Sequence, residues 1–116
     1  MSFQEFAHIR EIAERHEAAG RGLGPIRLEL EVAISALTEE RSLELMKIVC
    51  FGRDYLPKEG ENGVNEFVKY EAGTWLDSPA GRPGYLADKP LARYLNQAEQ
   101  KLRGEWPKER IERSNN

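Results

Sequence analysis

The chain has 116 residues, of which 40% are hydrophobic and 32% are charged, and its 17 basic and 20 acidic residues leave a formal charge of −3. A chain of this length fits one compact domain with one core, since domains usually contain roughly 100 to 150 residues. The near-balance of charge argues against bulk electrostatic attraction to nucleic acid or to an anionic membrane. Cys50 is the only cysteine, which excludes an intrachain disulfide and a multi-cysteine zinc site.

The first predicted helix begins at Phe3, because Ser2 and Glu5 have the spacing of a capping box. Apolar residues follow at steps of three and four until Gly20 ends the pattern. A glycine-rich loop comes next, and Pro25 stands where the first-turn proline of a second helix belongs.

Two periodicities compete in the second element, residues 26–34. A stripe with helical spacing comprises Ile26, Leu30, Ala33, Ile34 and Leu37. An alternation with period two, typical of a half-buried strand, comprises Ile26, Leu28, Leu30, Val32 and Ile34. We prefer the helix, because a lone strand has no evident partner in this chain and because alanine, leucine and glutamate favour helices. The strand is the alternative.

The third predicted helix starts after Thr38, which resembles an N-cap. Glu39 and Glu40 follow in the first turn, where the helix dipole favours negative charge. The helix is expected to run to Phe51 and to stop at Gly52. Its apolar residues occupy most of its circumference, which predicts the central and most buried helix of the fold.

Residues 56–63 are a loop by composition, with two glycines, a proline and an asparagine. The apolar positions after this loop predict a fourth helix that extends from Val64 to near Ser78.

A second loop, residues 80–84, leads to a fifth predicted helix, with Asp88 as its N-cap and Pro90 in its first turn. Gly104 is expected to end this helix. Residues 105–116 read as a polar tail whose Trp106 and Ile111 dock on the body.

The fold class expected from these elements is all-α. We predict a single helical domain over residues 1–104, built as a compact bundle of about five helices. The hydrophobic third helix is central, and the first helix is partly independent of it.

No motif in the chain assembles a catalytic, metal or cofactor site. The glycines of residues 20–24 precede a helix as in a phosphate-binding loop, but no parallel strand comes before them and Pro25 lacks an N–H, so we interpret them as a linker. His8 and His16 lack a matching ligand pair and are expected at the surface or its boundary. Cys50 lies within an apolar helix and is expected to be a small buried hydrophobe.

The one candidate binding site lies after the third helix, where Arg53, Asp54 and Tyr55 come together. We expect these residues, with Arg82 and Tyr85 from the second loop, to line a shallow polar site for a partner. The structural alternative is that Arg53 pairs with a carboxylate or caps free carbonyls while Asp54 starts the next turn.

Partners other than protein are disfavoured by the sequence. Basic residues near the C-terminus alternate with glutamates, a pattern of a solvated helix face rather than of a phosphate-binding patch, so we expect no nucleic acid. The N-terminus lacks the features of a signal peptide, and no apolar run approaches the ~20 residues that cross a bilayer. We therefore expect a cytoplasmic protein without membrane contact.

Three segments resemble a family of small all-helical proteins, common in proteobacteria, that is known as domain of unknown function 3775. They are residues 33–37 with Glu40, residues 43–55 and residues 85–95. The family pattern has a Gly-Arg-Gly-Asp turn after the third helix, where this chain lacks the second glycine, so that Asp54 follows Arg53 directly. The resemblance implies an all-α fold and carries no activity to any residue.

The function expected from the sequence is a non-enzymatic protein-interaction or regulatory module, with a homodimer through an exposed apolar helix face as one form. Two alternatives stay open. One is a small ligand-binding or accessory enzyme domain that uses Arg53, Asp54 and Tyr55. The other is an inhibitor from a mobile element or phage that presents acidic surface to a nucleic-acid-binding protein.

Overall fold

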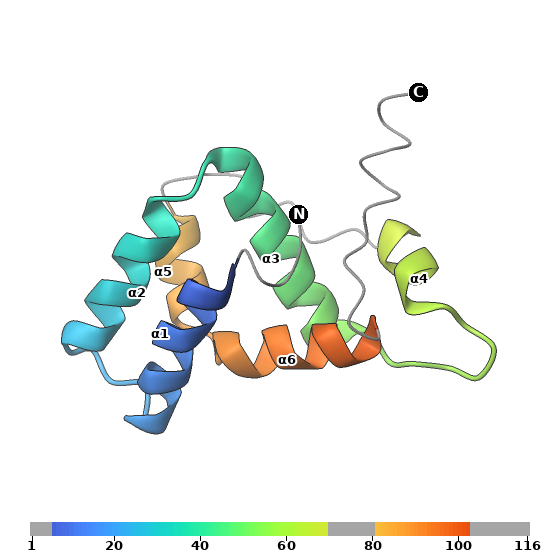
Figure 1. Ribbon diagram of the computed structural model, residues 1–116, viewed down its shortest axis with the longest axis horizontal. Helices are drawn as coiled ribbons and strands as arrows, with labels where there is room; N and C mark the ends of the chain where they lie inside the picture. Colours follow the sequence, from blue (N-terminus) through green and yellow to red (C-terminus); the bar gives the residue numbers. More distant parts are fainter. Residues whose placement is uncertain (1–5, 70–80, 103–116) are drawn as a thin grey trace.

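The computed structural model describes residues 6–69 and 81–102, which form six α-helices and contain no strand (Figure 1). The all-α prediction is confirmed, and residues 26–34 are helical, so the strand alternative is wrong. The helices are α1 (Ala7–Ala18), α2 (Pro25–Ser35), α3 (Glu39–Asp54), α4 (Gly63–Lys69), α5 (Arg82–Ala87) and α6 (Leu91–Lys101).

Helices α1 and α2 form a pair joined by the glycine-rich loop. Beyond the α1 C-cap, Gly20 has a φ of 85°, a left-handed conformation that glycine adopts without steric cost. Pro25 is the first residue of α2, as predicted. The predicted start at Phe3 and the capping box of Ser2 and Glu5 lie outside the described residues.

Helix α3 is the central helix, as predicted. The Thr38 side chain accepts a hydrogen bond from the backbone N–H of Arg41 at 3.2 Å, which makes it the expected N-cap. Eight of the 16 residues of α3 are buried. The prediction that Gly52 stops this helix is wrong: α3 continues to Asp54 and is capped by Tyr55. Gly52 instead allows the α6 backbone to approach closely.

Helix α4 lies beyond one end of α6, on the far side of the molecule from α2 (Figure 1). It is held by Phe67, whose ring meets the Phe51 ring edge to face at 5.3 Å between centroids. Its first residue, Gly63, packs against the backbone of Lys101. The predicted end near Ser78 lies outside the described residues.

The predictions of a loop over residues 80–84 and of an N-cap at Asp88 are wrong, because helix α5 begins at Arg82 and ends just before Asp88. Arg82, Pro83 and Gly84 are helical, and Asp88 caps the C-terminus of α5. The N-terminus of α6 is capped instead by Glu17 of α1, whose carboxylate accepts the N–H groups of Ala92 at 2.9 Å and Arg93 at 3.3 Å. Gly104 and the predicted tail lie outside the described residues.

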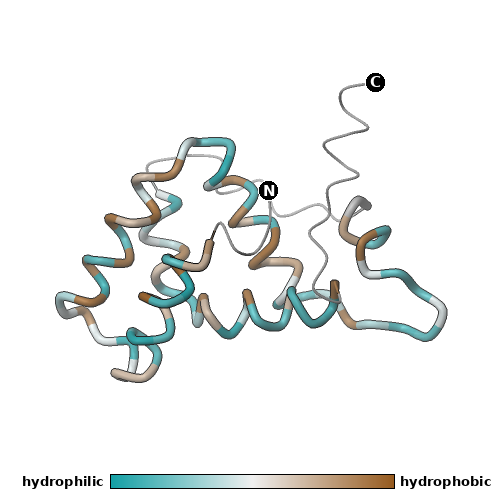
Figure 2. Tube along the Cα trace, in the orientation of Figure 1, coloured by the Kyte–Doolittle hydropathy of each residue, from teal (hydrophilic) through white to brown (hydrophobic). Residues whose placement is uncertain are grey.

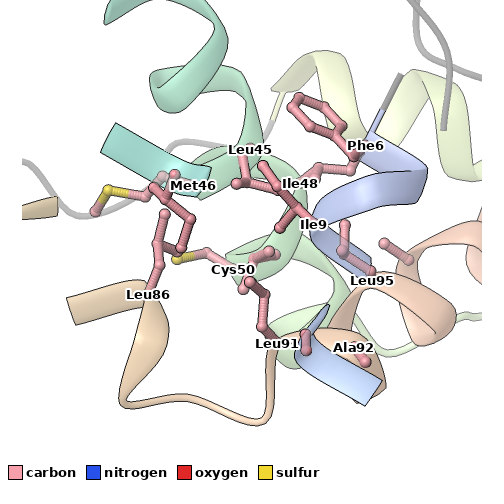
Figure 3. Close-up of a cluster of buried hydrophobic side chains, with 14 of the residues drawn as sticks. Phe6, Ile9, Leu45, Met46, Ile48, Cys50, Leu86, Leu91, Ala92 and Leu95 are labelled. Carbon is pink, nitrogen blue, oxygen red and sulfur yellow. The ribbon is translucent and has the colours of Figure 1, made fainter. Parts of the chain in front are cut away.

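The core fills the space between α3, α6, α1 and α5 (Figure 3). Helix α3 packs mainly on α6, α1 packs on α2 and α6, and α2 packs on α5. Side chains such as Phe6, Ile48 and Leu95 are fully buried, and each contributes about 1.5 to 3 kcal/mol of transfer free energy. Helix α2 lies at one edge of this arrangement, with hydrophobic positions along its length (Figure 2).

Candidate functional site

Arg53 and Asp54 form a two-pronged ion pair at the C-terminus of α3. Arg53 donates from Nε to Oδ1 at 2.7 Å and from Nη2 to Oδ2 at 3.0 Å. Its third nitrogen, Nη1, donates to the Tyr85 hydroxyl at 3.3 Å. The hydrogen bond to the Asp54 carboxylate, and to a smaller extent the one to the Tyr85 hydroxyl, raises the pKa of the Arg53 guanidinium. The guanidinium is therefore occupied on all three nitrogens by groups of its own chain, which matches the structural alternative for this residue.

Tyr85 connects the Arg53–Asp54 ion pair to the turn after α5. The Lys89 ammonium lies 4.9 Å from the centroid of the Tyr85 ring, a cation–π distance. Tyr85 thus joins Arg53 through its hydroxyl and Lys89 through its ring face. This arrangement holds α5 against the end of α3.

Lys101 of α6 also contacts the C-terminal end of α3, and the sequence did not indicate this contact. Its Nζ donates to the Gly52 carbonyl at 2.6 Å, so it satisfies one of the carbonyls left free at the end of α3. A cation here is also favoured by the helix dipole. Desolvation lowers the pKa of Lys101, partly offset by the charge of Asp54.

Tyr55 turns away from Arg53. Its ring stacks on Phe51 at 4.7 Å, and its hydroxyl donates to the Glu61 carboxylate at 3.4 Å. Desolvation and the neighbouring glutamates raise the pKa of Tyr55. An open depression of about 440 Å³ adjoins it and is lined by Phe51, Asp54, Tyr55, Leu56, Lys58, Glu61 and Glu66.

The prediction that Arg82 lines the same surface is wrong. Arg82 is buried, with 2% of its surface exposed, and its Nη1 donates to Ser42 Oγ at 2.7 Å. Ser42 lies eleven residues before Arg53 in α3, which is roughly 16 Å along the helix axis. The structure therefore brings together Arg53, Asp54 and Tyr85, and Tyr55 shares an open depression with Asp54, whereas Arg82 lies apart from all of them.

Cys50 and the two histidines are the other residues that the sequence analysis considered for chemistry. Cys50 is buried, as its apolar helix predicted, and this burial raises the pKa of its thiol. His8 is exposed, but the expectation for His16 is wrong: it is buried, and its Nε2 donates to the Gly22 carbonyl at 2.9 Å. Within residues 6–69 and 81–102, no group of three or more histidine, cysteine or acidic side chains is placed to hold a metal ion. No helix in this part of the chain is long and apolar enough to span a bilayer.

Sequence reasoning did not identify the outer face of α2 as an exposed apolar surface. Leu28 and Val32 lie one turn apart and expose 62% and 60% of their surfaces. Pro25, Ser35 and Ala36 are also exposed on this side. We call these five residues the α2 face: Pro25, Leu28, Val32, Ser35 and Ala36. The signal in the sequence was the alternation that suggested a strand, because it counted Leu28 and Val32, which the helical stripe leaves out.

Two sets of ion pairs border the α2 face. On one side, Arg15 of α1 donates to Glu29 at 2.7 and 3.3 Å. On the other side, Arg27 contacts Glu31 and forms an ion pair with Asp88. The charges beside the face are thus engaged within the chain, and none lies on it.

The sequence matches no protein-family model, and searches of curated proteins and of solved structures find no match either.

Proposed function

We propose that the protein is a non-enzymatic interaction module that binds a protein partner through the α2 face. The observation that carries this proposal is the exposure of Leu28 and Val32 side by side on one helix. Large aliphatic side chains so exposed on neighbouring turns are typical of binding surfaces, whereas single exposed apolar residues are ordinary. A helix face of this kind is suited to another helix or an apolar groove.

The corner formed by Arg53, Asp54 and Tyr85 is a weaker candidate for partner binding than the α2 face. A recognition arginine gains most when its donors are free to meet a partner's carboxylate or phosphate. Arg53 already donates to Asp54 and Tyr85, so a ligand would have to replace these bonds. The α2 face has no such competition, because its residues carry no charge and their side chains need no hydrogen bond except that of Ser35.

We propose that the chain is a member of the proteobacterial family it resembles, since residues 43–55 and 85–95 of that resemblance include most of α3 and the first turn of α6. We propose a cytoplasmic location, for which the single, buried, free Cys50 is suitable because it needs no oxidising compartment. Recovery of the protein in a membrane or extracellular fraction of its source cells would contradict that location.

The test is an affinity capture with tagged protein from a lysate of the source cells, with and without nuclease. Wild type is compared with Val32→Glu, which places a charge on the α2 face, and with Arg53→Glu, which reverses the charge at residue 53. We expect a stoichiometric protein, either a different one or an untagged copy of this chain, that survives nuclease, is lost with Val32→Glu and is retained with Arg53→Glu. The reverse pattern, or loss only on nuclease treatment, would contradict the proposal.

A further inference from the structure

We infer that the occupant of the α2 face is a second copy of this chain, with the two α2 helices packed antiparallel around a two-fold axis at Val32. This inference rests on the proposed function, because it names the partner of the same face.

The α2 face is an uncharged strip. At about 100° per residue, Pro25, Leu28, Val32, Ser35 and Ala36 fall within one third of the helix circumference. All five are exposed, while Leu30 and Ile34 point to the opposite side and are buried in the core. Helix α2 therefore has two apolar sides, an inner one that packs in the core and an outer one that is exposed.

The register of this strip is complementary to itself. Leu28, Val32 and Ala36 stand at i, i+4 and i+8 and form one ridge of the kind that packs into the groove of another helix. In an antiparallel pair centred on Val32, Leu28 of one copy meets Ala36 of the other, and Val32 meets Val32. A large side chain thus opposes a small one at both ends, and the same contact occurs twice, as two-fold symmetry requires.

The bordering charges permit this pairing. Two chains of charge −3 repel at long range, but Glu29 is paired with Arg15, and Glu31 and Asp88 share Arg27. These three acidic groups thus carry their own counter-charges into the interface. Nucleic acid or anionic lipid finds no cation on the α2 face itself, so those partners lack the electrostatic attraction on which they depend.

The size of the face predicts a weak dimer. A stable interface buries about 800 Å² on each partner, which one helix face of five residues does not reach. We therefore expect reversible association that increases with protein concentration.

The first experiment is sedimentation equilibrium of the full chain at concentrations from about 1 μM to about 1 mM, the range in which weak dimers dissociate. We expect the weight-average mass to rise with concentration for wild type and to stay monomeric for Val32→Glu. Val32 is largely exposed, so this variant should fold, which its helical circular dichroism and thermal unfolding would verify.

The second experiment tests the axis by crosslinking. In the proposed dimer, residue 32 meets its own copy, so Val32→Cys chains should form a disulfide under mild oxidation, which needs Cβ atoms within about 4.5 Å. Asn96→Cys, exposed on α6, is the matched control and should crosslink at least tenfold more slowly. The native Cys50 is buried and should not compete.

The outcomes separate the two proposals. A wild type that remains monomeric over the whole range, a dimer that Val32→Glu does not dissociate, or equal crosslinking of the two cysteine variants overturns the inference. If the chain is monomeric but a different protein is captured and is lost with Val32→Glu, the proposed function stands and only the second copy is rejected. If neither association depends on Val32, both proposals fail.

Discussion

The backbone carbonyl of Tyr94 in α6 occupies the space in which a side chain on Gly52 of α3 would stand. A Cβ at residue 52 would overlap this oxygen and lie only 2.9 Å from the Ala98 Cβ. The two central helices therefore approach each other more closely here than any side chain would allow.

We predict that Gly52→Ala destabilises the protein by about 1 to 3 kcal/mol through overpacking. Alanine improves the helix propensity by only about 1 kcal/mol, and the obstacle is backbone rather than a flexible side chain, so the steric cost prevails. The measurement is urea unfolding followed by circular dichroism. Gly22→Ala is the control, because a Cβ there meets nothing within 4 Å. Equal stability of Gly52→Ala and wild type would show that the helices separate without cost.

Removal of the cap that Glu17 provides to α6 should also weaken the fold. The carboxylate accepts two N–H groups of the first turn of α6, which are otherwise left without partners. We expect Glu17→Ala to cost about 1 kcal/mol, as other N-cap deletions do. The same denaturation assay with Glu14→Ala, an exposed glutamate in the preceding turn, should show a smaller loss. The opposite order would contradict the capping role.

Ser42 and Arg82 should be energetically coupled. The serine hydroxyl accepts from Arg82 and donates to the Glu39 carbonyl at 3.0 Å, all in a largely buried position. We predict that Ser42→Ala costs about 1 to 3 kcal/mol, since it removes an acceptor from a buried guanidinium. In an Arg82→Met background the same substitution should cost less. Thermal unfolding of the double-mutant cycle measures this difference, and a coupling energy near zero would exclude the contact.

Arg53→Ala should reduce stability by less than about 1 kcal/mol, because its ion pair is partly exposed to solvent, which screens the two charges. The variant also frees the Tyr85 hydroxyl and Asp54 from this arginine. Chemical denaturation gives the stability, and the affinity capture should be unchanged. Loss of a small-molecule signal in a thermal-shift panel of metabolites would instead favour the ligand-binding alternative at this corner.

The ion pair of Glu29 with Arg15 predicts a dependence of stability on acid pH. The hydrogen bond from Arg15 lowers the pKa of Glu29 below its ordinary value of 4.5. The unfolded chain therefore binds the proton more readily, and the stabilisation is complete above pH 4.5 and lost as the pH falls through the lowered pKa. The stability difference between wild type and Glu29→Gln should be constant near neutral pH and shrink below pH 4.5. A difference that grows in acid would contradict the pairing.

Local patterns identified most of the helices that the structure describes. Thr38 as a cap, Pro25 as a first-turn residue and the apolar stripe of α2 depend on neighbours within a few residues, so they are readable in sequence order. The extent of α3 was underestimated because Gly52 was taken for a helix stop. Glycine by itself destabilises a helix, and only the close approach of α6 explains why Gly52 lies within α3.

The candidate site depended on contacts that no local pattern contains. Sequence placed Arg53, Asp54 and Tyr55 together because they are consecutive, yet a helix end sends neighbouring side chains in different directions. Arg82 was grouped with them as a polar loop residue, whereas α5 carries it into the core beside Ser42. Glu17 caps a helix that begins 74 positions later in the chain, and neither residue signals the other.

The sequence by itself determined that the chain is helical, that α3 is its most buried helix and that Cys50 is a core residue, since periodicity and composition control which side of a helix avoids water. Only the tertiary structure decided which of the apolar residues of α2 remain outside. The helix has more hydrophobic positions than one packed side can bury, and the placement of α1 and α5 covers Leu30 and Ile34 but leaves Leu28 and Val32 exposed.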